Sequence, residues 1–156
     1  MPQFKKILCP VDFDPNSLLA LRLASELAQE GKATLHLLHV VAMPPGPEVA
    51  LPFGKMETAA RTRLERLARQ KVTCEARYQI EVMMGDPAVE VLQAAKRLRA
   101  NLIVMATHGR RGLRRLVLGS VAERVIREAP CPVLTVKPKS AAARSSPSRP
   151  VKKRRP

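Results

Sequence analysis

The sequence predicts a single-domain α/β fold, in which a parallel β-sheet is covered by helices on both faces. Five short apolar segments typical of strands alternate along the chain with four segments whose apolar residues follow helical spacing. The strand segments are apolar almost throughout, as expected where both faces of a sheet are buried. A chain of 156 residues can also bury a sizeable core.

The first half of the chain contains two predicted strands and the start of a third unit. Residues 4–11 form the first strand, and Asp14 followed by Pro15 is typical of a helix start. One face of this helix carries leucines and alanines at helical spacing, and Gly31 is expected to end it. Residues 33–41 form the second strand, and a proline-rich loop over residues 42–54 follows.

The second half repeats the pattern three times. A helix is expected from about Met56 to Lys71, followed by a strand over residues 72–85. Asp86 and Pro87 repeat the signal for a helix start, and the apolar residues 100–107 form the fourth strand. A last helix from Ser120 and a strand over residues 131–138 complete the domain, which we place at residues 1–138.

The net charge of +15 is unevenly distributed. Seven basic residues and no acidic ones lie from Pro138 onward, so this short segment holds almost half of the net charge. Residues 139–156 are rich in Ser and Pro and lack apolar periodicity, which predicts a disordered basic tail. The tail is a solubilising segment or a weak contact for polyanions, and an aromatic fraction of 3% argues against a base-stacking platform for single-stranded nucleic acid.

The cysteines indicate a reducing compartment. Cys9, Cys74 and Cys131 are odd in number, widely spaced and without a C-x-x-C pair, which argues against a disulfide framework and a zinc site. The N-terminus has neither the pattern of a signal peptide nor that of a membrane span, so we expect a cytoplasmic protein without membrane contact.

The segment between the fourth strand and the last helix is the main candidate for a binding site. Ser120 and Glu123 fit an S-x-x-E capping box, which predicts a helix start with free N–H groups and a positive dipole end. Gly109 and Gly119 let the backbone turn tightly or approach a ligand closely. Two interpretations of the segment are open: it binds phosphate groups, or Ser120 only caps the helix and the glycines only form turns. Its four arginines likewise either bind an anion or face solvent.

The strand histidines and the possible catalytic residues indicate neither a metal site nor a catalytic site. His36 and His39 are three residues apart on a strand and so point to opposite faces, which favours core or rim histidines over a metal pair. No nucleophile, base and orienting group stand together, so no catalytic residue is assigned.

Several of these segments resemble the universal stress protein family. The stretch from Met105 to Val136 resembles the C-terminal signature of that family, whose nucleotide-binding branch carries G-x2-G-x9-G-[ST]. Gly109, Gly119 and Ser120 match this pattern, and Ala106 stands where it has its first glycine. The residues KKILCPVDFDPNS, LHLLHV, GDPA and APCPVLTVKP extend the resemblance over residues 1–138.

This resemblance implies a Rossmann-like sheet with strand order 3-2-1-4-5, ATP at the carboxyl ends of the strands, and a homodimer formed through the last strand (residues 131–137). Asp12 is the candidate to hold Mg²⁺ together with ATP oxygens. His108 is either a ligand contact or an exposed turn residue. The residues that the resemblance implies around ATP are Pro10, Val11, Asp12, Val40, Met105, Ala106, Thr107, His108, Gly109, Arg110, Gly119, Ser120 and Val121.

The predicted function is therefore that of an ATP-binding universal stress protein that acts as a stress-response module or switch. Three alternatives remain. One is a family member that binds no nucleotide and acts through protein contacts, which Ala106 keeps open. Another is a protein that associates with nucleic acid through its basic tail. The third is a weak ATPase, whose hydrolysis of ATP is expected to be slow.

Overall fold

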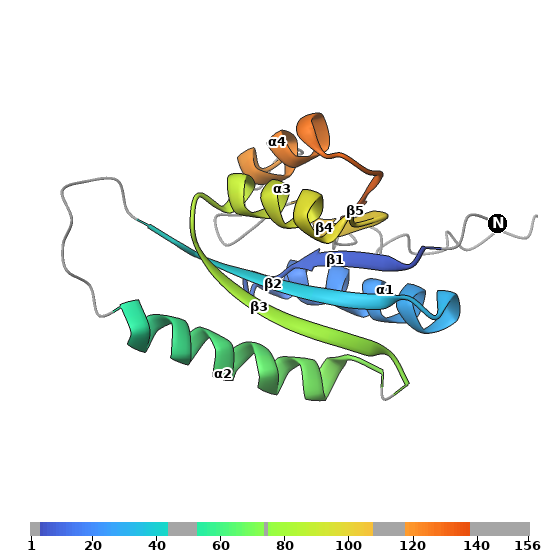
Figure 1. Ribbon diagram of the computed structural model, residues 1–156, viewed down its shortest axis with the longest axis horizontal. Coiled ribbons are helices and arrows are strands. Elements are labelled where there is room, and N and C mark those ends of the chain that lie inside the picture. Colours follow the sequence, from blue (N-terminus) through green and yellow to red (C-terminus); the bar gives the residue numbers. More distant parts are fainter. Residues whose placement is uncertain (1–3, 44–52, 74, 108–117, 138–156) are drawn as a thin grey trace, which may run out of the picture.

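The computed structural model describes residues 4–43, 53–73, 75–107 and 118–137. In this part of the chain five strands and four helices alternate, and the strands form one parallel sheet in the order β3-β2-β1-β4-β5 (Figure 1). The predicted α/β fold and strand order are therefore confirmed. The elements are β1 (Lys6–Pro10), α1 (Pro15–Gly31), β2 (Thr34–Ala42), α2 (Phe53–Lys71), β3 (Arg77–Gly85), α3 (Pro87–Leu98), β4 (Leu102–Ala106), α4 (Ser120–Glu128) and β5 (Val133–Val136).

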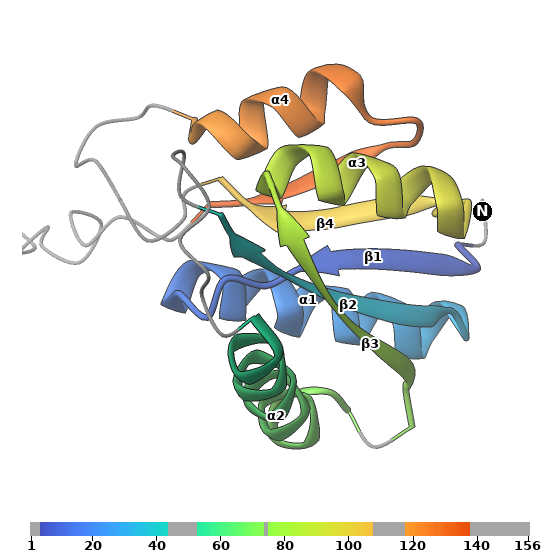
Figure 2. The same cartoon turned by 60° about the vertical axis from the view of Figure 1, so that its left-hand side comes forward.

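Two helix layers cover the sheet, with α1 and α2 on one face and α3 and α4 on the other (Figure 2). Strand β2 supplies both cores, because Leu35 and Leu37 pack with the α1–α2 layer while Leu38 packs with the α3–α4 layer. All three leucines are at most 1% exposed, and burying each contributes roughly 1.5–3 kcal/mol. Aliphatic packing on both faces thus holds the strand ends in place.

Two of the predicted helix starts are confirmed. Asp14 caps α1 by accepting a hydrogen bond of 2.8 Å from the Asn16 N–H. Asp86 caps α3 in the same way, with 2.9 Å to the Val89 N–H. In both helices a proline occupies the first turn, where a missing N–H costs nothing.

The predicted end of the first helix at Gly31 is confirmed, but the left-handed residue is not the glycine. Gly31 is the last residue of α1, and Lys32 takes the left-handed conformation that ends the helix, with φ of 51°. The Lys32 N–H reaches the carbonyls of Ala28 and Gln29, so these capping hydrogen bonds offset the cost of a non-glycine residue there. Arg99 ends α3 in the same manner, with φ of 52°.

Several predicted boundaries are also wrong. β3 begins at Arg77 rather than at residue 72, because the Val72 N–H still bonds to Ala68 and the Ala76 N–H closes a turn on Thr73. α2 begins at Phe53, inside the predicted loop. β4 and β5 are shorter than predicted at both ends, although the flanking residues Thr107 and Pro132 still form backbone hydrogen bonds with the neighbouring strand.

The strand order changes direction at β1, which pairs with β2 on one side and with β4 on the other. In open α/β sheets, ligands bind outside the carboxyl ends of the strands at such a switch point. In Figure 2 these ends lie where α1 and α4 begin. The predicted tail, residues 139–156, lies outside the described residues, and no described helix is long and apolar enough to cross a membrane.

Candidate functional site

A cavity of about 1060 Å³ lies at the switch point. Its walls come from the carboxyl ends of β1, β2 and β4, the first residues of α4, and the facing sides of α2 and α3. This volume is at the upper end of the range typical of small-molecule sites, which is roughly 300–1,000 Å³.

The cavity brings together those described residues that the family resemblance implies around ATP. The ten that line it are Pro10, Val11, Asp12, Val40, Met105, Ala106, Thr107, Gly119, Ser120 and Val121. His108, Gly109 and Arg110 lie outside the described residues, as do the other loop arginines.

The two described ends of the loop after β4 are joined directly. The Gly119 N–H donates to the Thr107 carbonyl at 2.8 Å, and the Thr107 N–H donates to Val136 on β5 at 3.1 Å. These bonds hold the start of α4 beside the end of β4. Thr107 and Gly119 therefore lie side by side on the cavity wall.

The predicted capping box at the start of α4 is wrong. Gly119 is the N-cap, with φ of −64° and ψ of 145°, and no side chain makes a capping hydrogen bond there. Ser120 lies one position too far into the helix to cap it, and the Glu123 carboxylate lies 3.8 Å from Arg127. The first turn of α4 therefore presents its N–H groups and the positive end of its dipole without a side-chain cap.

The opposite wall is organised by the segment after β1. The Val11 N–H donates to Leu38 at 2.8 Å, and the Val11 carbonyl lies 2.7 Å from His39 Nδ1. Because a carbonyl only accepts, Nδ1 of His39 carries the proton in this contact. The Asp12 carboxylate accepts the Asp14 N–H at 3.0 Å, which ties it to the start of α1.

Phe13 and Arg63 complete this wall. Phe13 has a left-handed backbone, with φ of 63°, which is rare for a bulky side chain. Its ring centroid lies 4.5 Å from that of His39, and the Arg63 guanidinium carbon lies 4.1 Å from the Phe13 ring centroid. All three residues line the cavity.

The sequence reasoning missed Phe13 and Arg63, and it treated His39 as a core or rim residue. No local pattern distinguishes Arg63 from the other cations of α2, since its contact with Phe13 spans fifty residues of chain. The available signal was position: Phe13 directly follows Asp12 at the end of a predicted strand.

The Ala106 backbone is unstrained. The non-glycine residues with positive φ in the described part of the chain are Phe13, Lys32 and Arg99. Ala106 instead continues β4 and pairs with Val136, and its methyl group packs against the α1–α2 core. A residue with a Cβ atom is therefore accommodated where the signature has glycine.

The described residues contain no group of three His, Cys, Asp or Glu side chains that could hold a metal ion. Asp12 and Glu123 are the two carboxylates on the described cavity wall. A divalent cation here would need further oxygen ligands from a bound molecule.

A sequence model of the universal stress protein family matches residues 3–137. The chain belongs to this family. A universal stress protein of Methanocaldococcus jannaschii is 37% identical over 142 residues, which cover 86% of this chain and 82% of that relative.

Solved structures of the family share the fold. The universal stress protein UspA from Lactobacillus plantarum is 26% identical and has a TM-score of 0.72, covering 87% of this chain and 99% of its own. A universal stress protein from Archaeoglobus fulgidus, solved in complex with dAMP, is 20% identical with a TM-score of 0.62, covering 86% of this chain and 98% of its own.

Proposed function

We propose that this universal stress protein binds ATP in the cavity at the carboxyl ends of β1, β2 and β4, and acts as a stress-response module whose state depends on that nucleotide. The observation that carries the proposal is the convergence of the strand ends and the α4 N-terminus on one cavity. The A. fulgidus relative, solved with dAMP, supports an adenine nucleotide as the ligand class.

The phosphates belong at the start of α4. Gly119, Ser120 and Val121 line the cavity there, and the first turn has no side-chain cap. Backbone N–H groups and the helix dipole together favour an anion at such a position. Thr107 and Gly119, joined by a hydrogen bond, border the same region.

The ribose and base belong nearer β1 and β2. Val11 and Val40 provide apolar surface and backbone groups on that wall, and Asp12 provides a carboxylate that can accept ribose hydroxyl groups. Asp12 is also the residue that would share a Mg²⁺ ion with phosphate oxygens, because Mg²⁺ commonly takes one or two carboxylates plus substrate phosphates.

The edge strand β5 supports a homodimer as the working state. β5 ends the sheet and pairs only with β4 among the described strands. Leu134 on this strand and Ile126 on the adjacent helix are 38% and 44% exposed, an apolar surface suited to a second copy. Cys9 and Cys131 are free thiols, which fits the reducing cytoplasm as the compartment.

Analysis of the purified protein by mass spectrometry after denaturation tests the ligand. We expect co-purified adenine nucleotide, approaching one per subunit, and binding heat when Mg-ATP is added to the stripped protein in a calorimeter. A protein that carries no nucleotide and gives no heat refutes the proposal and favours the family member that acts through protein contacts.

Substitutions of Ser120 separate the ligand site from the fold. Ser120→Asp puts a carboxylate at the first turn of α4, where it favours the helix dipole but repels phosphate. We expect thermal stability equal to or above that of the wild type, with ATP binding weakened by tenfold or more. Ser120→Ala is the matched control: it loses no capping bond and should bind ATP within about threefold of the wild type. Equal affinity of Ser120→Asp and Ser120→Ala would exclude phosphate from this helix end.

A further inference from the structure

The wall of the cavity contains a cation that the proposed function does not use. Arg63 is the one Lys or Arg on the described part of that wall, and it comes from α2. The remaining described titratable groups there are Asp12, Glu123 and His39.

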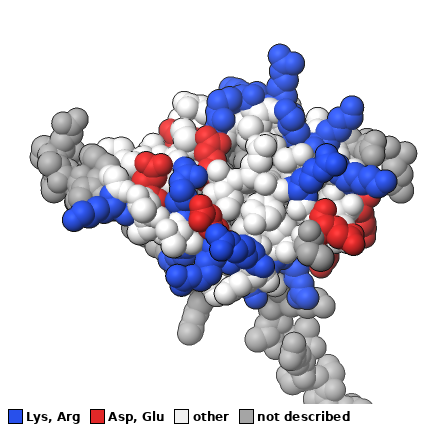
Figure 3. All heavy atoms as spheres, turned by 60° about the horizontal axis from the view of Figure 1, so that its bottom comes forward, with Lys and Arg blue, Asp and Glu red and all other residues white. Residues whose placement is uncertain are grey.

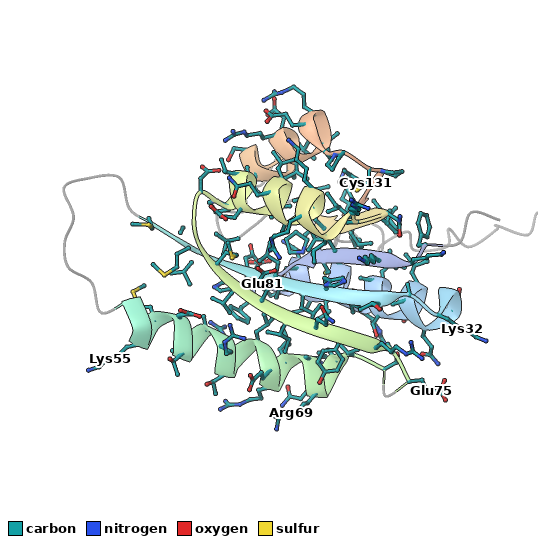
Figure 4. The ribbon with its side chains drawn as sticks, viewed as in Figure 1. Lys32, Lys55, Arg69, Glu75, Glu81 and Cys131 are labelled. Carbon is teal, nitrogen blue, oxygen red and sulfur yellow. The ribbon has the colours of Figure 1, made fainter. Side chains whose placement is uncertain are left out.

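Arg63 differs from Arg61 and Arg69 of the same helix in its partners. Arg61 and Arg69 pair with Glu57 and Glu65 one helical turn away, at 3.6 and 3.8 Å. Figure 4 shows Lys55 and Arg69 directed away from the sheet, and Figure 3 shows basic side chains interspersed with acidic ones over the face turned toward the viewer. No described carboxylate forms a salt bridge with Arg63, whose guanidinium lies over the Phe13 ring.

Phe13, on which the Arg63 guanidinium lies, in turn packs against a second flat side chain, that of His39. Its ring lies against His39, tilted by 42°, and His39 is fixed by its contact with the Val11 carbonyl. His39, Phe13 and Arg63 thus form a ladder of flat groups, anchored at the end of β2 and finishing at an exposed guanidinium on the cavity wall. A guanidinium is planar and has two faces, so one face can pack on an aromatic ring while the other stacks against a further flat group.

The ladder and the anion-binding helix end come from opposite layers of the sheet. Arg63 belongs to the α1–α2 layer, whereas the start of α4 belongs to the α3–α4 layer. A nucleotide whose phosphates lie at Ser120 therefore extends its base toward β2 and α2. This places the base, rather than the triphosphate, near Arg63.

We propose that Arg63 is a specificity-determining residue that stacks its guanidinium on the nucleobase and extends the His39–Phe13 ladder by one flat group. This inference rests on the proposed function. Stacking requires the plane of the guanidinium in addition to its charge, and nucleobases stack on arginine planes in many protein complexes. The ligand class selected is accordingly a phosphorylated compound with a flat aromatic base, and not a simple polyphosphate.

Calorimetric titrations of the full chain with Mg-ATP and with inorganic tripolyphosphate test this assignment. Arg63→Lys keeps the charge and loses the plane, and Arg63→Met loses both. We expect both variants to bind ATP about tenfold more weakly than the wild type, with unchanged affinity for tripolyphosphate. Arg66→Lys and Arg66→Met are the controls, because Arg66 is exposed on the same helix and does not line the cavity.

Each other outcome overturns a different statement. If Arg63→Lys binds ATP like the wild type while Arg63→Met is weak, only charge matters and stacking is refuted. If both variants weaken ATP and tripolyphosphate equally, Arg63 contacts phosphate and not the base. ATP binding unaffected by either substitution removes Arg63 from the site and leaves the proposed function standing. A wild-type protein that binds neither ligand refutes the proposed function itself.

Discussion

Replacing Ala106 with glycine restores the family signature at the one position where this chain departs from it. If the nucleotide site needs a glycine there, Ala106→Gly should tighten ATP binding strongly. The structure leads to the opposite expectation. Ala106 has an ordinary strand backbone and pairs with Val136, so glycine would relieve no strain.

The magnitude of the change follows from the strand and the lost methyl group. Glycine in a strand costs roughly 0.5–1 kcal/mol relative to alanine, because it loses more backbone freedom on folding. The Ala106 methyl group packs partly buried against the α1–α2 core, and half of the roughly 0.8 kcal/mol for a fully buried methylene is about 0.4 kcal/mol. We therefore expect Ala106→Gly to lower the free energy of unfolding by about 1–1.5 kcal/mol.

Urea unfolding without ligand measures the stability, and calorimetry with Mg-ATP measures the affinity. We expect the ATP dissociation constant to stay within about threefold of the wild type, a difference of less than about 0.7 kcal/mol. Ala100→Gly is the control, since Ala100 is buried just before the other end of β4 and does not line the cavity. It should lose comparable stability with no effect on ATP.

Two results would refute this reasoning. An ATP dissociation constant lowered tenfold or more by Ala106→Gly would mean that the Ala106 methyl group obstructs the ligand. A gain in stability would mean that Ala106 is strained where it appears relaxed. Either result would also revive the alternative that the wild-type chain has given up nucleotide binding.

Three further predictions concern the fold around the site. Gly85→Ala should lower the free energy of unfolding in urea by about 1–3 kcal/mol, because φ is +147° at Gly85. Gly54→Ala, in the open first turn of α2, is the control and should be neutral or stabilising. Equal effects of the two substitutions would refute the backbone argument. Burial, together with the charges of Lys6 and Arg97, lowers the pKa of His36 against the opposing effect of Glu81, so unfolding takes up a proton. Stability should therefore be complete above about pH 6.5 and decline below it, and His36→Leu should flatten that decline. Burial raises the pKa of Cys9 to about 12, so in a Cys74→Ser background a thiol reagent at pH 7.4 should modify the half-buried Cys131 and spare Cys9 until the protein unfolds; equal labelling rates would contradict this.

The fold could be predicted because its signals are local. Apolar strands, proline in the first helical turn and the caps Asp14 and Asp86 each act within a few residues. Helix ends are harder to predict, because the left-handed residues that follow α1 and α3 are Lys32 and Arg99, and neither is the glycine or asparagine that usually marks such a position. The strand start at Arg77 depended on a turn closed by Ala76, which propensity does not reveal.

The candidate site could be predicted in part for the same reason. Asp12 and Gly119 are recognisable because they directly follow a predicted strand or precede a predicted helix, and family resemblance adds Val40 and Thr107. Arg63 could not be found this way, because its position over Phe13 depends on how α2 packs against the sheet. Sequence patterns identify residues that belong to strand ends, and packing decides which helix supplies the remaining wall.

The two-layer construction of the cavity gives the proposed switch a physical basis. α2 contacts β2 and β3, whereas α4 contacts α3 and β5. A nucleotide that stacks on Arg63 and places its phosphates at Ser120 would contact both helix layers at once. Its binding would favour the relative position of the two layers in which Arg63 and Ser120 are separated by the length of the nucleotide. A ligand shifts such an equilibrium only by its difference in affinity for the two arrangements. Adenosine, which lacks phosphates, and tripolyphosphate, which lacks a base, would each reach one layer and should each leave that equilibrium largely unchanged. Only a molecule with both parts would carry the signal, which is why the base contact at Arg63 matters beyond its share of the affinity.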